Sequence, residues 1–451
     1  MADPAPTELG WPPGPRGSRR SGNLRDIRED RLGFFRRCAE LGDFVPFRVG
    51  KRQVVFLNHP DLIEVVVSKR AGDYSKNYLS DFFHPILKKQ LLLSETDSWL
   101  EQRRLAHPVL RPDRLTGYAD TMAAFTARMC DRWEDGRRLD IDAQMRRLTL
   151  EILAQTVFDV DVTREAAEAG DIVDAILDDV ATRAGGRAYV PFVLPTPANL
   201  RLLRTLRRLD ALMNELIDER RANAEGRDDL LSRLVADLQR SNDDVKLTAI
   251  PLFFAGHETT AMTLTWTLYL LSHHPEVTAR MLAEVDEVLG DRLPAMGDVR
   301  ALRYIGCVVL EALRLYPPIW GFGRQAMRDT EIGPYRIPEG TTVFMSQWVL
   351  HRDRRWFEDP DAFRPERWED GLERRLPRCV YVPFGAGPRR CLGNNFAVIE
   401  AVIALSIMCR RFRFDMVDPG HPEMEPLITL RPKRRIAMTL HARERTTAPA
   451  G

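Results

Sequence analysis

The sequence has little of several features that would point to particular classes of protein. Its net charge is only +1, so the composition gives no reason to expect nucleic acid or an anionic membrane as a partner. Its six cysteines are scattered without a Cys-x-x-Cys pair, which argues against a zinc finger and a disulfide framework. The first 20 residues lack an apolar run of signal-peptide length. We therefore expect a cytoplasmic protein without a membrane anchor.

One long segment is almost free of charge. Between Leu247 and Pro275 the only formally charged side chain is that of Glu258, and about 20 apolar residues suffice to span a membrane. The segment also contains Pro251 and six threonines, and an ionisable side chain near the middle of a bilayer is costly. A long helix through the interior of a globular protein explains the pattern better than a membrane span does.

Apolar residues recur at steps of three and four along most of the chain, which is typical of amphipathic helices. This pattern predicts helices over residues 118–133, 145–158, 166–182, 200–222, 229–238, 275–289 and 394–410. Strand-like zones are expected as a hairpin around Gly50 and at residues 333–344 and 428–440, with a proline-containing loop at residues 183–199. The length alone would suggest two or three domains. The predicted fold class is mainly α with a small β region.

The strongest local pattern is FGAGPRRCLG, from Phe384 to Gly393. Its glycines and proline predict a tight loop directly before the helical pattern at residues 394–410. Such a loop places the sulfur of Cys391 near backbone N–H groups and the positive end of a helix, and both favour the metal-binding thiolate. A buried structural cysteine is the alternative. However, a chance match to Phe-x-x-Gly-x-Arg-x-Cys-x-Gly is rare, on the order of 1 in 10,000.

Through this loop the sequence resembles the cytochrome P-450 family of haem-thiolate monooxygenases. The resemblance implies that Cys391 is the metal ligand of haem b, with Phe384 and Arg389 beside the cofactor. It also implies a single domain around a buried haem, which replaces the several domains suggested by length. We expect a flexible lead at residues 1–30, the monooxygenase domain at 31–441 and a flexible tail at 442–451.

Two further segments fit the family's structural motifs. Glu311 and Arg314 match its Glu-x-x-Arg, and at a separation of three they share one helix face. This spacing is weak by itself, because a solvated ion pair shows it too. Arg367, within the downstream segment Phe363–Trp368, matches the family's third member. The resemblance implies a Glu–Arg–Arg network that stabilises the haem-side core.

The segment AGHETT, residues 255–260, resembles the family's oxygen-activation motif. In a helix the hydroxyl of Thr259 can bond back to the carbonyl four residues earlier, and Gly256 is expected to let the helix open locally. The resemblance assigns Glu258 and Thr259 to catalysis, where they handle oxygen and protons. Pro251, one turn before the motif, departs from the family's pattern because it removes a backbone donor.

Three more side chains are implied to contact the haem propionates together with Arg389. Trp99 and Arg103 match the family's Trp-x-x-x-Arg, and Arg324 follows a Pro-Pro pair at the family's spacing. A buried aromatic residue beside a surface arginine would give the same Trp-x-x-x-Arg pattern and stays an alternative.

The resemblance implies insertion of one oxygen atom of O2 into a hydrophobic substrate, by hydroxylation or epoxidation. A thiolate ligand favours O–O cleavage on haem iron. The two electrons would come from NAD(P)H, and no flavin or iron–sulfur segment is recognisable in the 451 residues. We therefore expect a separate ferredoxin or flavodoxin with its reductase. Basic residues such as Arg104, Arg111 and Arg390 are candidates for docking an acidic partner, and a solvated charged face is an equally good explanation of them.

Candidate walls of the substrate pocket, chosen by analogy to the family, carry no charge, which favours a hydrophobic ligand. They are Phe82, Phe83, Phe253, Phe254, Ala255, Ile319, Trp320, Phe322 and Ile428. Core packing would explain any one of them equally well. A terpenoid of secondary metabolism is our first expectation, a polyketide the second and a fatty acid the third. A haem-thiolate enzyme that couples or rearranges its substrate and a haem-binding sensor are the alternatives, and the presence of Glu258 and Thr259 argues against both.

Overall fold

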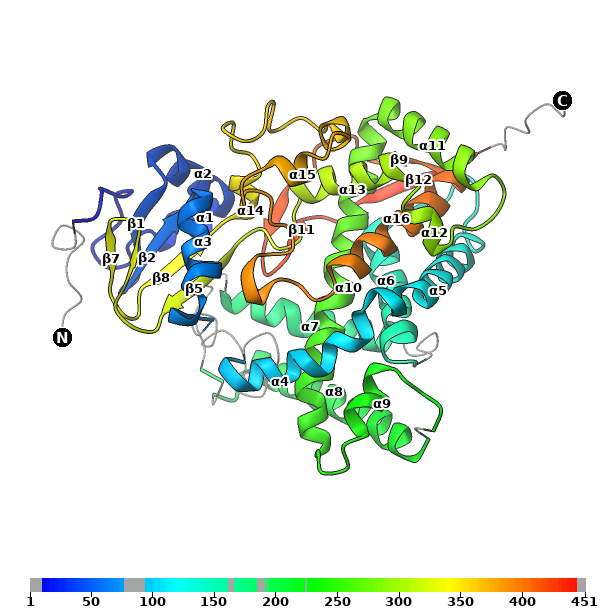
Figure 1. The fold of residues 1–451 in the computed structure, drawn as a ribbon, viewed down its shortest axis with the longest axis horizontal. Coiled ribbons are helices and arrows are strands. Elements are labelled where there is room, and N and C mark those ends of the chain that lie inside the picture. Colours follow the sequence, from blue (N-terminus) through cyan, green and yellow to red (C-terminus); the bar gives the residue numbers. More distant parts are fainter. Residues whose placement is uncertain are drawn as a thin grey trace.

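A long central helix, α10 (Asn242–His273), organises the molecule. The computed structural model describes residues 10–76, 94–160, 166–184, 191–192, 194–223 and 225–443. In Figure 1, α10 runs through the middle of the helical part, and the larger sheet lies at the end nearer the N-terminus. The helix begins with a capping box, in which the Ser241 hydroxyl and the Asp244 carboxylate satisfy each other's backbone N–H groups.

The remaining helices surround α10 or cover the sheet. They are α1 (Leu24–Glu29), α2 (Arg31–Leu41), α3 (Pro60–Glu64), α4 (Thr96–Ala106), α5 (Pro112–Cys130), α6 (Ile141–Val157), α7 (Ala166–Ala184), α8 (Pro197–Ala222), α9 (Leu230–Val235), α11 (Pro275–Leu289), α12 (Met296–Val299), α13 (Arg303–Leu315), α14 (Gln347–Leu350), α15 (Leu372–Arg375) and α16 (Asn394–Arg411). The main hydrophobic core lies where α10 packs with α6, α13 and α16, and where α5 packs against α6 and α16.

Four threonines of α10 satisfy their hydroxyls within the helix itself. The hydroxyls of Thr259, Thr260, Thr263 and Thr267 each donate to the carbonyl four residues earlier, at 2.6–3.1 Å. The helix also continues through Pro251 without interruption. Among the described residues no helix, α10 included, is long and apolar enough to cross a membrane.

A five-stranded sheet in the order β1-β2-β8-β5-β3 forms the left end of the molecule in Figure 1. Its strands are β1 (Phe44–Val49), β2 (Arg52–Leu57), β3 (Tyr74–Ser75), β5 (Phe322–Ala326) and β8 (Thr342–Met345). β1 and β2 pair antiparallel around the turn at Gly50, so the predicted hairpin is confirmed. β3 pairs antiparallel with β5, Ser75 opposite Gln325, although almost 250 residues separate them in sequence. This pairing brings residues just after β3 close to Arg324.

Among the described residues, seven further strands complete the β part. They are β4 (Arg138–Asp140), β6 (Thr330–Ile332), β7 (Tyr335–Ile337), β9 (Phe412–Met416), β10 (Met424–Pro426), β11 (Leu430–Pro432) and β12 (Ala437–Ala442). β12 lies between β4 and β9, whereas β6–β7 and β10–β11 are separate antiparallel pairs. The predicted strand zones at 333–344 and 428–440 therefore each contain strands, and the fold class is mainly α with a small β region in one domain.

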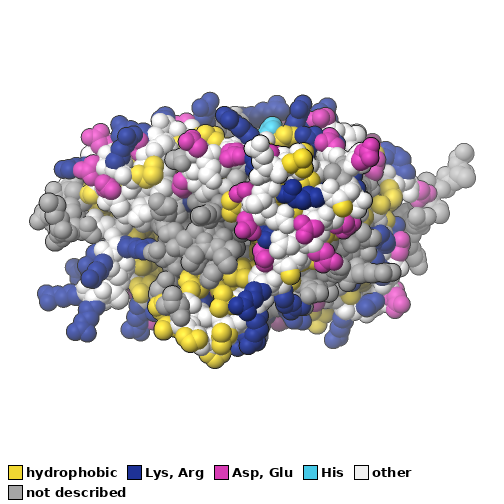
Figure 2. Space-filling model, turned by 90° about the horizontal axis from the view of Figure 1, so that it is seen from below, with side chains coloured by type: hydrophobic (Ala, Val, Ile, Leu, Met, Phe, Trp, Pro, Cys, Tyr) yellow, Lys and Arg dark blue, Asp and Glu magenta, His cyan; other side chains and the backbone are white. Residues whose placement is uncertain are grey.

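Most differences from the predicted elements lie at helix ends. The predicted helix at 275–289 matches α11, whereas α5 begins six residues before the predicted start, at Pro112. The expected loop at 183–199 is shorter, because Pro197 begins α8 as a first-turn proline. Within the expected N-terminal lead, Trp11 is buried and its indole donates to the carbonyl of Arg336 at 2.8 Å. The face shown in Figure 2 carries both signs of charge, interspersed with hydrophobic side chains.

Candidate active site

The loop before α16 presents Cys391. Gly385 and Gly387 have φ angles of +69° and +68°, a region that side chains disfavour. A Cβ atom on Gly387 would lie 1.8 Å from the carbonyl oxygen of Val67, so only glycine fits there. The loop closes when the backbone N–H of Cys391 donates to the carbonyl of Phe384 at 2.9 Å. These contacts fix the cysteine directly ahead of the first turn of α16.

Cys391 is exposed, whereas the other five cysteines are buried. The protein atoms around the accessible thiol still raise its pKa, although the Gly393 N–H, Arg103 and Arg390 act in the opposite direction. In the protein without a bound metal ion, the expectation that the loop lowers the pKa of Cys391 is therefore wrong. The predicted favourable interactions exist, but the loss of hydration caused by the surrounding protein atoms outweighs them. Coordination to a metal ion deprotonates a thiol.

Two arginines lie over one indole ring near this loop. The guanidinium carbon of Arg389 is 4.2 Å from the centre of the Trp99 ring, and that of Arg103 is 5.6 Å away. Arg103 also donates to the carbonyl of Arg390, next to Cys391, at 3.1 Å. The structure thus brings the predicted residues Trp99, Arg103 and Arg389 together, and α4 and the cysteine loop supply them.

Lys76, which the motifs did not single out, joins this positive cluster. Burial, followed by the positive charges of Arg324 and Arg389, lowers the pKa of Lys76 to about 7, and Glu95 acts in the opposite direction. Glu95 also forms an ion pair with Arg389 and accepts the backbone N–H of Lys76 at 2.6 Å. The pairing of β3 with β5 places Lys76 here, so no local sequence pattern could have indicated it.

The predicted Glu311–Arg314–Arg367 network is present, and its Glu311–Arg314 pair is completely enclosed. Arg314 donates two hydrogen bonds of 2.8 Å to Glu311, and Arg367 donates one of 2.9 Å. Both Glu311 and Arg314 have 0% of their side-chain surface exposed. The Trp368 indole donates to the same carboxylate at 2.8 Å. Burial would raise the pKa of Glu311, but the hydrogen bonds and charge of Arg314, followed by Arg367, lower it below its usual value.

Arg314 has further partners in the loop that follows α14. Its guanidinium donates to the carbonyls of His351, Pro360 and Ala362 at 2.8, 2.5 and 2.9 Å. The group therefore ties α13 to three points of a long loop, which suits a structural clamp better than a reacting group.

On α10, Thr259 and Gly256 have different neighbours. The Thr259 hydroxyl donates to the carbonyl of Ala255 at 2.8 Å, as predicted from their spacing. A Cβ atom on Gly256 would lie 2.8 Å from both terminal methyl carbons of Leu153 on α6. The expected local opening of the helix at Gly256 is wrong, because α10 is continuous there and the glycine lets α6 approach closely.

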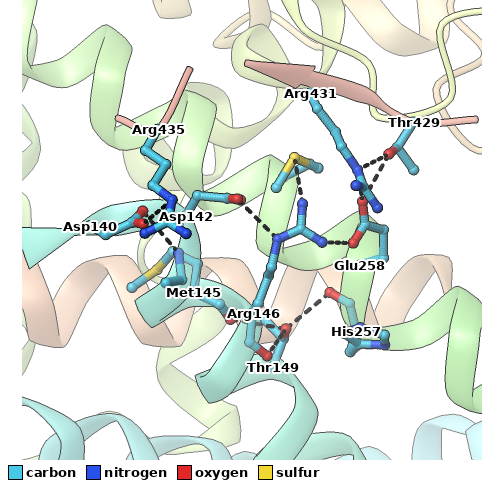
Figure 3. Close-up of polar contacts among 12 residues, drawn as sticks. Asp140, Asp142, Met145, Arg146, Thr149, His257, Glu258, Thr429, Arg431 and Arg435 are labelled. Carbon is cyan, nitrogen blue, oxygen red and sulfur yellow. Dashed lines mark hydrogen bonds and ion pairs between the residues drawn. The ribbon is translucent and has the colours of Figure 1, made fainter. Parts of the chain in front are cut away.

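Glu258, the residue before Thr259, is held by side chains from two other elements (Figure 3). It is 2% exposed, and one of its oxygens forms an ion pair with Arg146 of α6. The other oxygen accepts hydrogen bonds from the Thr429 hydroxyl and from Nε of Arg431, both at 2.8 Å. The motif indicated the acid, but nothing in the local sequence indicated these three partners.

The two arginines that hold Glu258 each bind a second carboxylate. Arg146 donates to Asp142, one turn earlier on α6, at 3.0 Å. Arg431 donates through Nη1 to Asp178 of α7 at 2.7 Å. Burial raises the pKa of Asp142 above its usual value even though Arg146 lowers it. Carboxylates and guanidiniums therefore alternate from Asp142 through Glu258 to Asp178.

Comparison with known proteins identifies the family. A model of the Cytochrome P450 family matches residues 12–439. The chain belongs to the cytochrome P450 family. Cyclooctatin synthase of Streptomyces melanosporofaciens is 35% identical to it over 88% of each protein. Pentalenene oxygenase of Streptomyces avermitilis is 32% identical over 91% of this chain and 93% of its own length. Cyclooctat-9-en-7-ol 5-monooxygenase of Streptomyces melanosporofaciens is 33% identical over 84% of each protein.

This cytochrome P450 is a haem monooxygenase, and its described residues fit the cofactor. Cys391 offers an accessible sulfur for the iron. Lys76, Arg103, Arg324 and Arg389 supply positive charge beside it, as the two carboxylates of haem require. Their convergence from four separate parts of the sequence is difficult to explain by stability alone, since like charges repel.

The candidate pocket residues lie in several environments. Phe253 and Phe254 line an apolar cavity of about 30 Å³ together with Ala154 of α6 and Phe158, the residue that follows this helix. Trp320 is 6% exposed within the aromatic cluster of the sheet, and its indole donates to the carbonyl of Leu427 at 2.9 Å. Of the other candidates, Ile319, Phe322 and Ile428 are partly buried, and the carbonyl of Ala255 accepts the Thr259 hydroxyl bond. Phe82 and Phe83 lie outside the described residues.

Proposed function

We propose that this cytochrome P450 hydroxylates or epoxidises a terpenoid, with electrons from NAD(P)H delivered by a separate ferredoxin or flavodoxin. The observation that carries the proposal is the accessible Cys391 beside a cluster of positive side chains, in a chain similar over most of its length to pentalenene oxygenase and cyclooctat-9-en-7-ol 5-monooxygenase. The uncharged candidate pocket residues agree with a hydrophobic substrate.

Each part of the site has a separate task in this proposal. Cys391 ligates the iron, and Arg103, Arg324 and Arg389 bind the propionates. Bound haem supplies the oxidising chemistry, which a thiolate ligand favours. Glu258 and Thr259 deliver protons during oxygen activation. The Thr259 hydroxyl, oriented by the carbonyl of Ala255, is the last donor of that relay.

Two other functions remain candidates on chemical grounds. A haem-thiolate enzyme that couples or rearranges its substrate, or a haem-binding sensor, has no need for an acid next to an alcohol. In this chain Glu258 is buried and fully hydrogen bonded beside Thr259, although a buried charge is costly to maintain. Retention of that arrangement favours a monooxygenase.

Carbon monoxide spectroscopy tests the assignment of the ligand. Reduced protein is expected to show the red-shifted Soret band of a thiolate-ligated haem, and Cys391→Ala should abolish it. Cys379→Ala is the matched control, because Cys379 is a buried cysteine of the same region and should leave the band unchanged. A band that survives in Cys391→Ala and disappears in Cys379→Ala would make the assignment wrong.

Difference spectroscopy against terpenoid, polyketide and fatty-acid panels tests the substrate class. A hydrophobic ligand that displaces water from the iron shifts the Soret band. We expect the terpenoids to produce this shift at the lowest concentrations. Preferential binding of fatty acids would favour the fatty-acid hydroxylase instead.

The proposed docking site of the electron donor can be tested by varying the salt concentration. Three arginines are exposed: Arg104 of α4, Arg111 shortly after that helix, and Arg390 directly before Cys391. An acidic ferredoxin or flavodoxin that docks on them should reduce the haem more slowly as ionic strength rises, because screening weakens attraction between exposed charges. A reduction rate that does not change with salt would exclude these residues as the docking site.

A further inference from the structure

A surface pocket of about 140 Å³ opens between α6, the end of α5 and the turn that joins α5 to β4. In Figure 1, α5 and α6 lie on the right, away from the five-stranded sheet. An engineered cavity of about 150 Å³ is large enough to bind benzene, so the pocket has room for a ligand with one ring. Of the described residues that line it, none belongs to the candidate active site.

The floor of the pocket is apolar and firmly packed. Met129, Trp133, Leu139 and Leu148 line it, and all four are buried. The Trp133 ring meets the ring of Phe414 on β9 edge to face, with the ring centres 6.0 Å apart. Because these side chains belong to the main hydrophobic core, the floor keeps its shape without a ligand. An apolar ligand body is the chemical match for such a surface.

The turn between α5 and β4 carries two exposed arginines of the rim, Arg132 and Arg137. Gly136, with a φ angle of +71°, allows the turn to bend, and its N–H donates to the carbonyl of Leu440 on β12 at 2.8 Å. The N–H of Leu440 donates in return to the carbonyl of Arg137 at 2.9 Å. The guanidinium of Arg137 also donates to the carbonyl of Arg132 at 3.2 Å. β12 therefore fixes the backbone from which both side chains reach the pocket.

The charges around the pocket do not balance. Arg147 of α6 donates to the Glu151 carboxylate at 2.8 Å, Arg128 lies 4.0 Å from it, and the Glu151 side chain is only 4% exposed. Arg132 and Arg137 form no ion pair with a carboxylate of the described residues, so the lining holds two positive charges in excess. Neighbouring like charges repel each other and destabilise the folded chain. Arginine is well suited, however, to bind a carboxylate from outside.

Gln144 adds a neutral donor to the pocket wall. The indole N–H of Trp133 donates to Oε1 of Gln144 at 3.3 Å. An indole nitrogen can only donate, so this bond fixes the orientation of the amide and leaves its NH2 group for other partners. Gln144 is itself half-buried. A ligand above Trp133 therefore meets amide and guanidinium donors, whereas the carboxylate of Glu151 already has Arg147 as its partner.

We propose that this pocket, which we call the Trp133 pocket, binds a small monocarboxylate with an apolar body of one ring, such as an aromatic acid. Arg132 and Arg137 bind the carboxylate, while Trp133 and Leu148 contact the body. A volume close to that of a benzene site limits the body to about one ring. The inference does not depend on the function proposed for the haem site, because the two sites share no residue.

Fluorine NMR of the haem-loaded protein, labelled with 5-fluorotryptophan, tests the site directly. The chain has eight tryptophans, and the signal that is missing from Trp133→Phe identifies the one in the pocket. Benzoate should shift that signal saturably. Benzyl alcohol lacks the charge and inorganic phosphate lacks the apolar body, so each should need a concentration about 10-fold higher for the same shift.

Three results of this titration would overturn the proposal. An unchanged Trp133 signal would mean that benzoate does not bind there, even if a change of the Soret band shows that it reaches the haem. An equal response to phosphate would reduce the Trp133 pocket to a general anion site. An equal response to benzyl alcohol would reduce it to an apolar cavity in which the arginines have no role.

Substitution of the rim arginines tests their role. Arg132→Gln and Arg137→Gln should each weaken benzoate binding about 2- to 5-fold, as expected for exposed charge pairs, and the double variant should weaken it further. Both side chains are exposed, so the variants should fold and load haem normally, which the carbon monoxide spectrum checks.

Arg138→Gln is the matched control. Arg138 is an exposed neighbour on β4 that does not line the Trp133 pocket, since alternation along the strand turns its side chain away from the face of Leu139. Its removal should leave benzoate binding unchanged. If Arg138→Gln loses as much affinity as Arg132→Gln and Arg137→Gln, the anion is attracted by the charge of the whole surface, and the proposed site is wrong.

Discussion

Glu311 and Glu258 are both buried carboxylates held by two arginines, yet the arginines around them continue to different partners. The remaining donors of Arg314 go to backbone carbonyls, and the side chains of Glu311 and Arg314 are sealed from solvent. Arg146 and Arg431 continue instead to carboxylates nearer the surface. Backbone carbonyls cannot exchange partners without unfolding a loop, whereas side-chain carboxylates can. The same chemical components therefore give a fixed clamp around Glu311 and an adjustable one around Glu258.

The largest expected effect is on folding, through Glu311→Ala. Breaking a buried pair by removing one partner costs about 3–5 kcal/mol, and Arg314 would be left buried without its carboxylate. The variant should yield little haem-loaded protein, measured by its absorbance ratio and carbon monoxide spectrum. Glu369→Ala, which removes an exposed partner of Arg280, should be close to the unmodified protein. A well-folded, haem-replete but inactive Glu311→Ala would contradict the structural role.

Substitutions at the Glu258 cluster should change chemistry and leave the fold intact. A positioned proton relay contributes ~10²–10⁴-fold to a proton transfer, so Glu258→Gln should slow turnover by at least the lower value. Thr259→Ala should still bind substrate and consume oxygen but release much of it as hydrogen peroxide. The measurement is product formed per NAD(P)H oxidised, with peroxide counted in parallel. Unchanged coupling in Thr259→Ala would remove its hydroxyl from the relay.

The contacts of Glu311 and those of Glu258 also differ in how far they could be predicted from the sequence. Glu311 and Arg314 lie one helix turn apart, so their pairing could be predicted from spacing, whereas Arg367 was assigned to the network only through the resemblance to the family. Arg146 and Arg431 are distant in sequence from Glu258, and only the packing of α6 and β11 on α10 brings them to it. Such contacts follow from tertiary packing and leave no periodicity or motif.

Lys76 and Gly256 illustrate the same limit. Lys76 reaches the positive cluster through the pairing of β3 with β5, which no local pattern encodes. The motif indicated Gly256, but the physical reason was wrong, since the close approach of Leu153 depends on another helix. Helices and the hairpin were predicted well because their hydrophobic periodicity and turn residues are local.

Exchange of arginine for lysine sharpens the contrast between the two clamps. Lysine keeps the charge but cannot reproduce the planar fork of donors. Arg314→Lys would leave buried carbonyls and part of Glu311 unsatisfied, at about 1–3 kcal/mol for each group. Arg146→Lys keeps an ion pair, and the side chain at this position is partly hydrated. This substitution should therefore lower the free energy of unfolding by about 1 kcal/mol. Chemical denaturation of both variants measures the difference, and equal losses would show that the two clamps are equally fixed.

A third buried glutamate tests the role of arginine in both clusters. Glu400 of α16 is 1% exposed, and neither carboxylate oxygen has a hydrogen-bond partner among the described residues. Burial raises the pKa of Glu400 well above its ordinary value. Because the raised pKa belongs to the folded state, the protonated form stabilises the fold below the unfolded pKa. This stabilisation is lost as pH rises towards the folded pKa.

The smallest effect is therefore expected for Glu400→Gln, and it should depend on pH. Glutamine cannot ionise. The free energy of unfolding of the variant should therefore increase relative to that of the unmodified protein as pH rises, by about 1 kcal/mol between pH 5 and pH 6. Urea denaturation at both pH values measures this difference. Glu311→Gln should behave in the opposite way, since Arg314 and Arg367 favour the ionised form of Glu311, whose pKa is lowered. That variant should lose stability relative to the unmodified protein as pH rises from acidic values. If both variants show the same pH dependence, the arginines do not determine which buried glutamate is charged.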